Sequence, residues 1–279
     1  MKIKCWVSRG SIPVCGPEYI KYGGTTTCIE IQPQNGNSII VDAGTGIRRL
    51  GIHLLKEKFQ SYHLLFTHAH WDHIMGLPFF KPLHIQRKKI RMYHCPYHTP
   101  FVNRMLSDLM SPPYFPVPCS LSKADITFVD ENRQAFEIGS VRVETIPISH
   151  PNGGGGYKFT ENGKTFVFLT DNELGYSHPG AKSFKDYRTF CQNADLLIHD
   201  AEYTPKEYDK TAGWGHSRYT DTVRLAIEAG VSTLGLFHLN QERTDHQMDT
   251  ILKHAQEIVA AQQPAIKCMV VAVESTFEL

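Results

Sequence analysis

Four side chains of the kinds that bind metal ions fall within six positions of the sequence, His68-Ala-His70-Trp-Asp72-His73. They follow a short apolar run, residues 64–66, that is typical of a buried strand. Because alternate residues of an extended chain point to the same side, His68 and His70 can converge on one ion. The turn into a helix at Ile74 carries Asp72 and His73 towards a second ion. The spacing therefore predicts a site for two metal ions at the end of a strand.

This motif resembles the signature of the metallo-β-lactamase superfamily, and the resemblance continues along most of the chain. The later matching residues are His150 in Pro-Ile-Ser-His-Pro, Asp171 in Phe-Leu-Thr-Asp-Asn and His238 in Leu-Phe-His-Leu. Each follows an apolar, β-branched run, as a ligand at a strand end should. The resemblance implies an α/β fold of the four-layer αββα sandwich type, in which two mixed sheets are flanked by helices. We expect residues 1–279 to form one such hydrolase domain.

The resemblance also implies how the ligands divide between the ions. One divalent ion is held by His68, His70 and His150, the other is held by Asp72, His73 and His238, and Asp171 bridges them. Asp42 in Asp-Ala-Gly-Thr-Gly46 has two interpretations. It either supports the ligand loop from behind, where carboxylates orient ligand side chains, or caps the helix that follows it.

Composition limits the classes of partner and compartment. The formal net charge is +1, which gives no general attraction to nucleic acid or to an anionic membrane. The seven cysteines are odd in number and contain no Cys-x-x-Cys pair, which argues against a disulfide framework and a zinc finger. No apolar run approaches the ~20 residues of a membrane span, and the N-terminus lacks a signal-peptide pattern. We expect a cytoplasmic protein without a membrane partner.

Periodicity and turn residues outline two similar halves. Strands are predicted at residues 3–7, 27–32, 38–41, 126–129, 141–146, 156–159, 165–169, 195–199, 233–239 and 267–273. Helical spacing of apolar residues predicts helices at 47–59, 101–110, 219–229 and 248–261. The dipeptides Asn35-Gly36 and Asn162-Gly163 predict hairpin turns.

Two segments outside the ligand motifs are candidates for substrate contact. Residues 76–122, rich in Pro and aromatic residues, are interpreted as a cap-like insertion over the metal site, in which Tyr114 and Phe115 could stack on a base. A self-packed surface loop is the equal alternative. The glycines Gly154 and Gly155 beside His150 could let the backbone approach a substrate, although a plain flexible turn explains them as well. The cationic run at residues 87–91 is interpreted as a solvated strand edge.

The reaction expected of such a site is hydrolysis. Two divalent ions can lower the pKa of a bridging water so that hydroxide forms near neutral pH. Ile198-His-Asp200-Ala-Glu-Tyr and Gly215-His216-Ser217 resemble two motifs of the phosphodiesterase branch of the superfamily. That resemblance implies that His216 protonates the leaving group and that Asp200 orients the His216 ring. Asp72 is also given a catalytic role. Enzymes of the tRNase Z type carry Glu at the position of Asp200.

The substrate is predicted from what the chain lacks. The tRNA endonucleases insert a long basic arm between the residues matching His150 and Asp171, whereas here about twenty residues separate them. Together with the near-zero net charge and the aromatic cap, this favours a small phosphodiester and no stable nucleic-acid partner. The small-substrate members of the branch include cyclic nucleotide and cyclic phosphate phosphodiesterases, so the resemblance implies a 3′,5′-cyclic nucleotide hydrolysed to the 5′-monophosphate. The alternatives are an RNA 3′-end processing nuclease of the tRNase Z type and a non-catalytic metal-bearing sensor. Zinc is favoured as the metal, with manganese or iron as options, and the cap would suit a homodimer.

Overall fold

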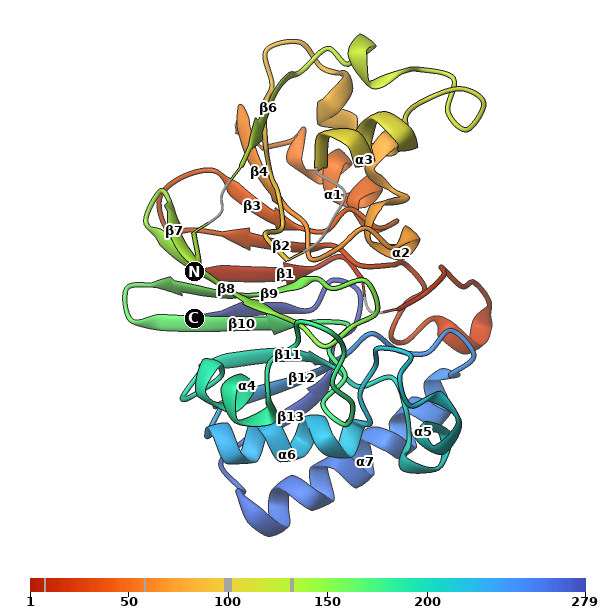
Figure 1. The fold of residues 1–279 in the computed structure, drawn as a ribbon, viewed down its shortest axis with the longest axis vertical. Helices are drawn as coiled ribbons and strands as arrows, with labels where there is room; N and C mark the ends of the chain where they lie inside the picture. Colours follow the sequence, from red (N-terminus) through yellow and green to blue (C-terminus); the bar gives the residue numbers. More distant parts are fainter. Residues whose placement is uncertain (8, 58, 98–101, 131–132) are drawn as a thin grey trace.

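Two seven-stranded sheets lie face to face at the centre of the computed structural model, and helices cover their outer faces (Figure 1). The structure describes residues 1–7, 9–57, 59–97, 102–130 and 133–279. Within these residues the first half of the chain builds most of one sheet, and the second half builds the other. The predicted four-layer αββα arrangement of two mixed sheets is confirmed.

The first sheet is antiparallel on one side of β3 and parallel on the other. Its strands, in spatial order, are β14 (Thr276–Glu278), β1 (Lys2–Cys5), β2 (Ile29–Gln32), β3 (Ser38–Val41), β4 (Ser61–Leu65), β5 (Lys89–Tyr93) and β6 (Asp125–Val129). The helices that follow these strands are α1 (Ile47–Leu54), α2 (Trp71–Ile74) and α3 (Val102–Leu109).

The second sheet has the same mixed character. Its strands, in spatial order, are β13 (Lys267–Val270), β12 (Thr233–Phe237), β11 (Leu196–Asp200), β10 (Lys164–Leu169), β9 (Gly155–Glu161), β8 (Val141–Pro147) and β7 (Ala135–Ile138). Its helices are α4 (Phe184–Phe190), α5 (Pro205–Thr211), α6 (Tyr219–Ala229) and α7 (Asp245–Gln262).

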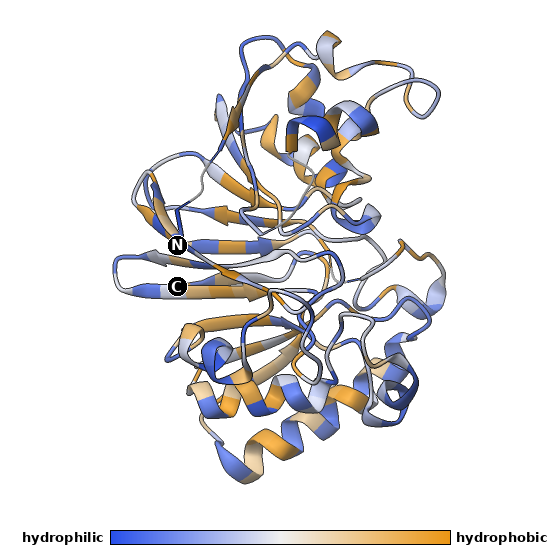
Figure 2. Cartoon of the chain, in the orientation of Figure 1, coloured by the Kyte–Doolittle hydropathy of each residue, from blue (hydrophilic) through white to orange (hydrophobic). Residues whose placement is uncertain are grey.

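The space between the sheets is filled by aliphatic side chains from the first sheet and mainly aromatic side chains from the second. Ile3, Ile31 and Val41 belong to the same buried cluster as Phe166 and Phe168. Full burial of each such side chain contributes about 1.5–3 kcal/mol. Figure 2 shows the apolar inner strands and the alternation of polar and apolar residues along the outer helices. This central layer holds the two halves together and fixes the edge where the loops of both sheets meet.

The structure corrects two details of the predicted organisation. The charged residues 87–91 do not mark a sheet edge, because β5 pairs with β4 on one side and β6 on the other. Lys89 and Arg91 are exposed while Ile90 is buried, so the charges project from one face of an inner strand. The predicted cap at 76–122 therefore includes a strand of the first sheet. Two positions in the predicted helices, residue 58 and Phe101, lie outside the described residues.

Among the residues that the structure describes, no helix has both the length and the apolar character needed to cross a membrane.

Candidate metal centre

The predicted ligands lie where strands of both sheets end on the same side. Since β8 and β10 both run antiparallel to β9, and β10, β11 and β12 are parallel, β8, β10 and β12 point in one direction. His150, Asp171 and His238 come within three residues of the ends of these three strands. The His68–His73 loop follows β4 of the other sheet. The structure thus brings all seven predicted ligands to one edge.

Three of the seven form a first group. One ring nitrogen each of His68, His70 and His150 lies within 4.8 Å of the others. His150 Nε2 is 3.0 Å from His70 Nδ1. The other nitrogen of His150, Nδ1, is 3.0 Å from the Gly215 carbonyl oxygen and can donate to it, which leaves Nε2 free to face the group.

The other four predicted ligands form a second group. Asp72, His73, Asp171 and His238 also place one ligand atom each within 4.8 Å of one another. Asp72 Oδ2 is 3.2 Å from the Nε2 atoms of both His73 and His238. All four side chains are buried.

Asp171 lies between the two groups. Its Oδ2 is 3.2 Å from His73 Nε2, and its Oδ1 is 3.3 Å from His238 Nε2, both in the second group. The same Oδ1 is 3.7 Å from His68 Nε2 and 3.9 Å from His150 Nε2 in the first group. This placement suits the bridging position expected for Asp171.

Carboxylates behind the ligands fix the orientation of two imidazole rings. Asp42 Oδ2 is 2.8 Å from His73 Nδ1, and Asp42 also accepts hydrogen bonds from the amide and hydroxyl of Thr67. Asp42 therefore supports the ligand loop, and the alternative that it caps the following helix is wrong, because Gly46 is the residue before α1. Glu202 Oε2 is 2.8 Å from His238 Nδ1. Such partners set the tautomer that points Nε2 at a metal.

The chemistry of the donor set fits divalent cations. Among the described residues, His73 Nε2 is a buried atom that makes no hydrogen bond. Burial lowers the pKa of His150 to about 3, which keeps this ring in the neutral, ligating form. Burial opposes ionisation of Asp72, but His73 and His238 outweigh it and hold the pKa of this carboxyl well below its ordinary value. A negative, buried carboxylate among imidazole nitrogens is the environment that a cation stabilises.

Burial lowers the pKa of His73 and His238, but the surrounding carboxylates outweigh it and hold both pKa values well above the ordinary one. A bound cation must therefore displace the protons from these two rings. Metal affinity at the second group is consequently coupled to pH.

Three residues of this edge adopt backbone conformations that are unusual for residues other than glycine. The φ angles are 63° at Asp42, 52° at Asp171 and 56° at His238. Positive φ is costly for side chains with a Cβ, and such residues persist where the surrounding structure holds them. The fold holds these three side chains on the ligand edge in spite of that cost.

The predicted acid pair is formed beside the second group. His216 Nδ1 is 2.7 Å from Asp200 Oδ2, so the shorter arm of Asp, compared with Glu, spans the distance. Burial lowers the pKa of His216, but Glu202 and Asp200 outweigh it and raise the value to about 9. The ring is therefore an imidazolium at neutral pH. With Nδ1 engaged, Nε2 is the atom available to give a proton.

Two buried carboxylates of this site were missed in the sequence. Glu202 holds His238 and lies 3.5 Å from His216 Nδ1. Glu173 accepts hydrogen bonds from the amides of Gly213 and Gly215, both at 2.7 Å, and thereby fixes the segment before His216. The available signal was position, since each acid follows a motif aspartate by two residues, Asp200 and Asp171 respectively.

The four predicted substrate contacts lie in two different places. Tyr114 and Phe115 line an apolar pocket together with Trp71, which stands between the ligands His70 and Asp72. Gly154 and Gly155 are buried and pack on the ligand loop instead: the Gly155 amide donates to the Thr67 carbonyl, and a Cβ at Gly154 would lie 3.2 Å from that oxygen. Their small size serves packing behind the loop, and contact with substrate stays a prediction for these two residues.

A family profile described as beta-lactamase superfamily domain matches residues 37–239, which include all seven predicted ligands. The chain belongs to the beta-lactamase superfamily. The resemblance found in the sequence is therefore confirmed, and the ligand edge lies within the matched domain.

Relatives within the superfamily are distant but extend over most of the chain. The ribonuclease Z of Oceanobacillus iheyensis is 20% identical over 266 residues, which cover 78% of this chain and 84% of that protein. The metallo-beta-lactamase fold protein YhfI from Bacillus subtilis has a TM-score of 0.70 at 17% identity, covering 100% of this chain and 99% of its own. Human tRNase Z, short form, has a TM-score of 0.63 at 16% identity, with 100% and 99% covered.

Proposed function

We propose that this protein is a metal-dependent phosphodiesterase whose metal ions are held by the seven ligands described above. The observation that carries the proposal is the hydrogen-bonded His216–Asp200 pair directly beside the metal groups. An alkoxide is a poor leaving group unless it is protonated, and a positioned imidazolium supplies that proton. When bound, a pair of divalent ions lowers the pKa of water and stabilises negative charge on the phosphoryl oxygens.

The residues of the chain perform the remaining steps. His216 Nε2 gives its proton to the leaving oxygen, while Asp200 and Glu202 stabilise the charged ring before transfer. The other groups orient ligands: Asp42 orients His73, Glu202 orients His238, and the Gly215 carbonyl orients His150. Zinc suits this set of five imidazoles and two carboxylates, although manganese or iron also accept such donors.

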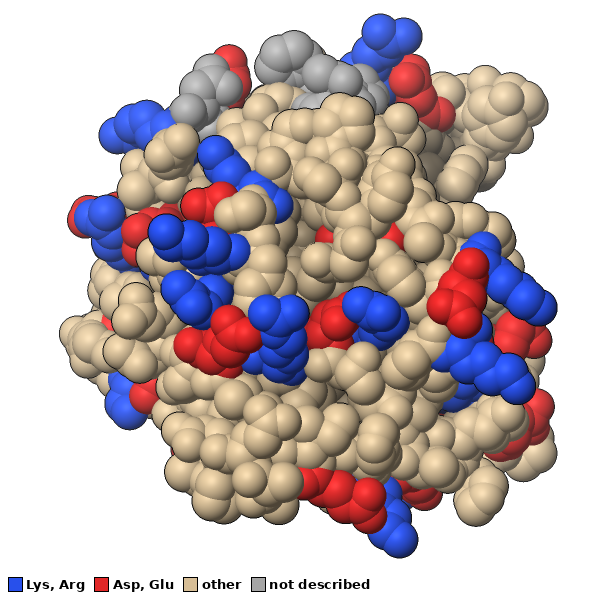
Figure 3. All heavy atoms as spheres, turned by 60° about the horizontal axis from the view of Figure 1, so that its bottom comes forward, with Lys and Arg blue, Asp and Glu red and all other residues tan. Residues whose placement is uncertain are grey.

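The comparisons favour RNA over a cyclic nucleotide as the substrate. Proteins named ribonuclease Z match most of the chain, as does a human tRNase Z in structure. We therefore propose a phosphodiester linkage near an RNA 3′ end as the first candidate. Binding of RNA in this case would depend on local contacts, because the formal net charge is only +1. On the one face shown in Figure 3, Lys and Arg are interspersed with Asp and Glu.

A small phosphodiester, including a 3′,5′-cyclic nucleotide, is the second candidate, and one observation favours it. Strands β9 and β10, between His150 and Asp171, are joined by the two residues Asn162 and Gly163 alone. This tight hairpin leaves no inserted arm there to clamp a large RNA.

The test is a substrate panel with the zinc- or manganese-loaded protein. It contains an RNA with a 3′ extension, cyclic AMP, cyclic GMP and bis(p-nitrophenyl) phosphate. We expect hydrolysis of at least one natural phosphodiester, and we expect His216→Ala to reduce it by about 10²–10⁴-fold with metal content unchanged. No turnover of any phosphodiester with both metal groups filled would contradict the proposal and favour the non-catalytic sensor.

A further inference from the structure

Two pockets of different character adjoin the metal centre. The apolar pocket has a volume of about 680 Å³ and is lined by residues that include Trp71, Met75, Met105, Leu109, Tyr114 and Phe115. The polar pocket has a volume of about 440 Å³ and is lined by residues that include Ser11, Tyr203, Lys210, Trp214, His216 and Asn240. Both volumes are in the range of small-molecule sites.

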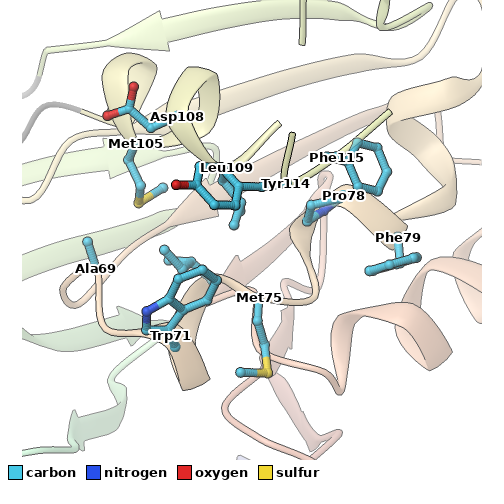
Figure 4. Close-up of a pocket in the computed structure, with 11 residues that line it drawn as sticks. Ala69, Trp71, Met75, Pro78, Phe79, Met105, Asp108, Leu109, Tyr114 and Phe115 are labelled. Carbon is cyan, nitrogen blue, oxygen red and sulfur yellow. The ribbon is translucent and has the colours of Figure 1, made fainter. Parts of the chain in front are cut away.

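The apolar pocket adjoins the ligand loop. Figure 4 shows Trp71 and Met75 on one side and the α3 residues Met105 and Leu109, with Tyr114, on the other. The Trp71 side chain is 64% exposed although its two neighbours in sequence are predicted metal ligands. An exposed ring at this position offers a flat surface to an aromatic group attached to the phosphate.

The polar pocket adjoins the acid pair. His216 Nδ1 is engaged by Asp200, and His216 lines this pocket, so the oxygen that takes the proton from Nε2 lies on this side of the centre. Trp214, two residues earlier, is 63% exposed at the same pocket. The leaving alcohol therefore enters the polar pocket.

The charges of the polar pocket favour an uncharged leaving alcohol. Glu207 is paired with Arg243, and Glu202 is engaged by His238 and Asn240. Lys210 and Glu242 also line the pocket, with opposite charges. With hydroxyl and amide side chains around them, these walls suit a hydroxyl-rich group such as a nucleoside rather than one with a second phosphate.

We infer that the substrate is a linear phosphodiester joining two different small organic groups, an inference that rests on the proposed phosphodiesterase function and replaces both substrates named there, a long RNA and a cyclic nucleotide. The leaving alcohol is an uncharged, nucleoside-like group against Trp214, and the phosphate of the product retains an aromatic group against Trp71. Water supplies the hydroxyl that bonds to phosphorus, the bond to the leaving oxygen breaks, and that oxygen takes a proton through His216. A 3′,5′-cyclic nucleotide has both ester oxygens in one ring and cannot fill both pockets with separate groups.

Two matched variants test the assignment. Trp71→Ala and Trp214→Ala remove rings of nearly equal exposure, one from each pocket. The reference substrate is 2′-deoxyadenosin-3′-yl benzyl phosphate, compared with two analogues in which methyl replaces either the benzyl group or the nucleoside. We expect deoxyadenosine and benzyl phosphate as products. We expect Trp71→Ala to reduce the kcat/KM preference for benzyl over methyl about tenfold, and Trp214→Ala to reduce the preference for nucleoside over methyl equally, as loss of one base–aromatic stack would.

Several outcomes would overturn the inference while leaving the phosphodiesterase function intact. Release of benzyl alcohol with the phosphate left on the nucleoside would reverse the orientation. The two-pocket assignment would also be wrong if both variants changed the same one of the two preferences, or if neither variant changed either preference. If the wild-type protein cleaves bis(p-nitrophenyl) phosphate but none of the three mixed diesters, the inference is wrong and the proposed function stands.

A binding measurement keeps the inference testable if no phosphodiester is cleaved, the outcome in which the proposed function fails. The chain has three tryptophans, and Trp6 is buried at 3% exposure. In the Trp71→Ala variant, Trp214 is therefore the exposed tryptophan whose fluorescence a ligand can quench. In the Trp214→Ala variant, that tryptophan is Trp71. In the metal-loaded protein, we expect deoxyadenosine to quench the first variant and benzyl phosphate to quench the second. The reverse pattern, or no quenching in either, would contradict the assignment.

Discussion

The hydrogen bond of 2.7 Å between His216 Nδ1 and Asp200 Oδ2 joins two residues that lie 16 positions apart and beside the metal groups. It fixes which nitrogen of His216 carries the proton towards the carboxylate and which faces the polar pocket. The pair therefore determines both the protonation state and the direction of the proposed acid.

Substituting Asp200 by Asn should change the pH dependence of turnover. Glu202 and Asp200 raise the pKa of His216 to about 9 against the effect of burial, so the acid is present at neutral pH and is lost as pH rises through that value. Asp200→Asn removes one of the two raising charges, and the alkaline limb of kcat should move to lower pH. The measurement is a pH profile on a diester with an alkyl leaving group. An unchanged limb would exclude His216 as the group that titrates.

Substituting Asp42 by Asn should weaken metal binding without removing a ligand. Asp42 holds His73 Nδ1 and the Thr67 amide, so the variant loosens the ring and loop that present ligands to the second group. Loss of such a supporting carboxylate typically costs 10–100-fold in metal affinity. Competition with a chelator measures this change. Asp125→Asn, at an exposed residue of β6, is the control and should bind metal as the wild type does.

Substituting Gly215 by Ala should disturb the first metal group. A Cβ at Gly215 would lie 2.0 Å from His150 Nδ1, and φ there is 98°. Gly180 is a matched control, because its φ is 82° and no atom lies within 4 Å of its added Cβ. Both variants should lose about 1–2 kcal/mol of unfolding free energy from the positive φ. Only Gly215→Ala should also lose metal, measured by elemental analysis, and equal metal content in the two would contradict the account.

Substituting Glu173 by Gln should affect poor leaving groups more than good ones. Glu173 accepts from the amides of Gly213 and Gly215 and from the Tyr208 hydroxyl, and an amide group would face these donors with its own N–H. The segment that positions His216 would shift. Turnover of an alkyl diester should fall by about a hundredfold, whereas that of bis(p-nitrophenyl) phosphate, whose leaving group needs no proton, should change little. Equal losses on both would indicate a structural role alone.

Sequence patterns predicted the fold and the ligand edge better than the elements between them. The seven ligands were recognisable because each follows a strong apolar run, and α6 begins and ends at the predicted Tyr219 and Ala229. Strand β5 was misjudged because its charges, Lys89 and Arg91, lie on the exposed face of an inner strand that pairs with both β4 and β6. Glu173 follows the motif residue Asp171 by two positions, but its role was not predicted because its partners are amides of a loop 40 residues later.

Helix α7 shows a signal that was present but not used. The helix begins at Asp245, three residues before the predicted start, because Thr244 and Gln247 form a capping box. The Thr-x-x-Gln spacing was visible in the sequence. The apolar pocket of the inferred substrate site has walls drawn from distant segments, such as Trp71 with Phe115, which no single stretch of sequence encodes.

Each proposed ion would be ligated by both sheets, because His68 and His70 meet His150, and Asp72 and His73 meet Asp171 and His238. The cations would thus cross-link the two sheets at the ligand edge, where acidic and imidazole side chains take the place of the apolar core. Any ion that binds only the assembled seam raises the melting temperature by mass action, in proportion to the logarithm of its concentration over its dissociation constant. The supply of metal would then determine the stability of the folded protein as well as its catalytic activity.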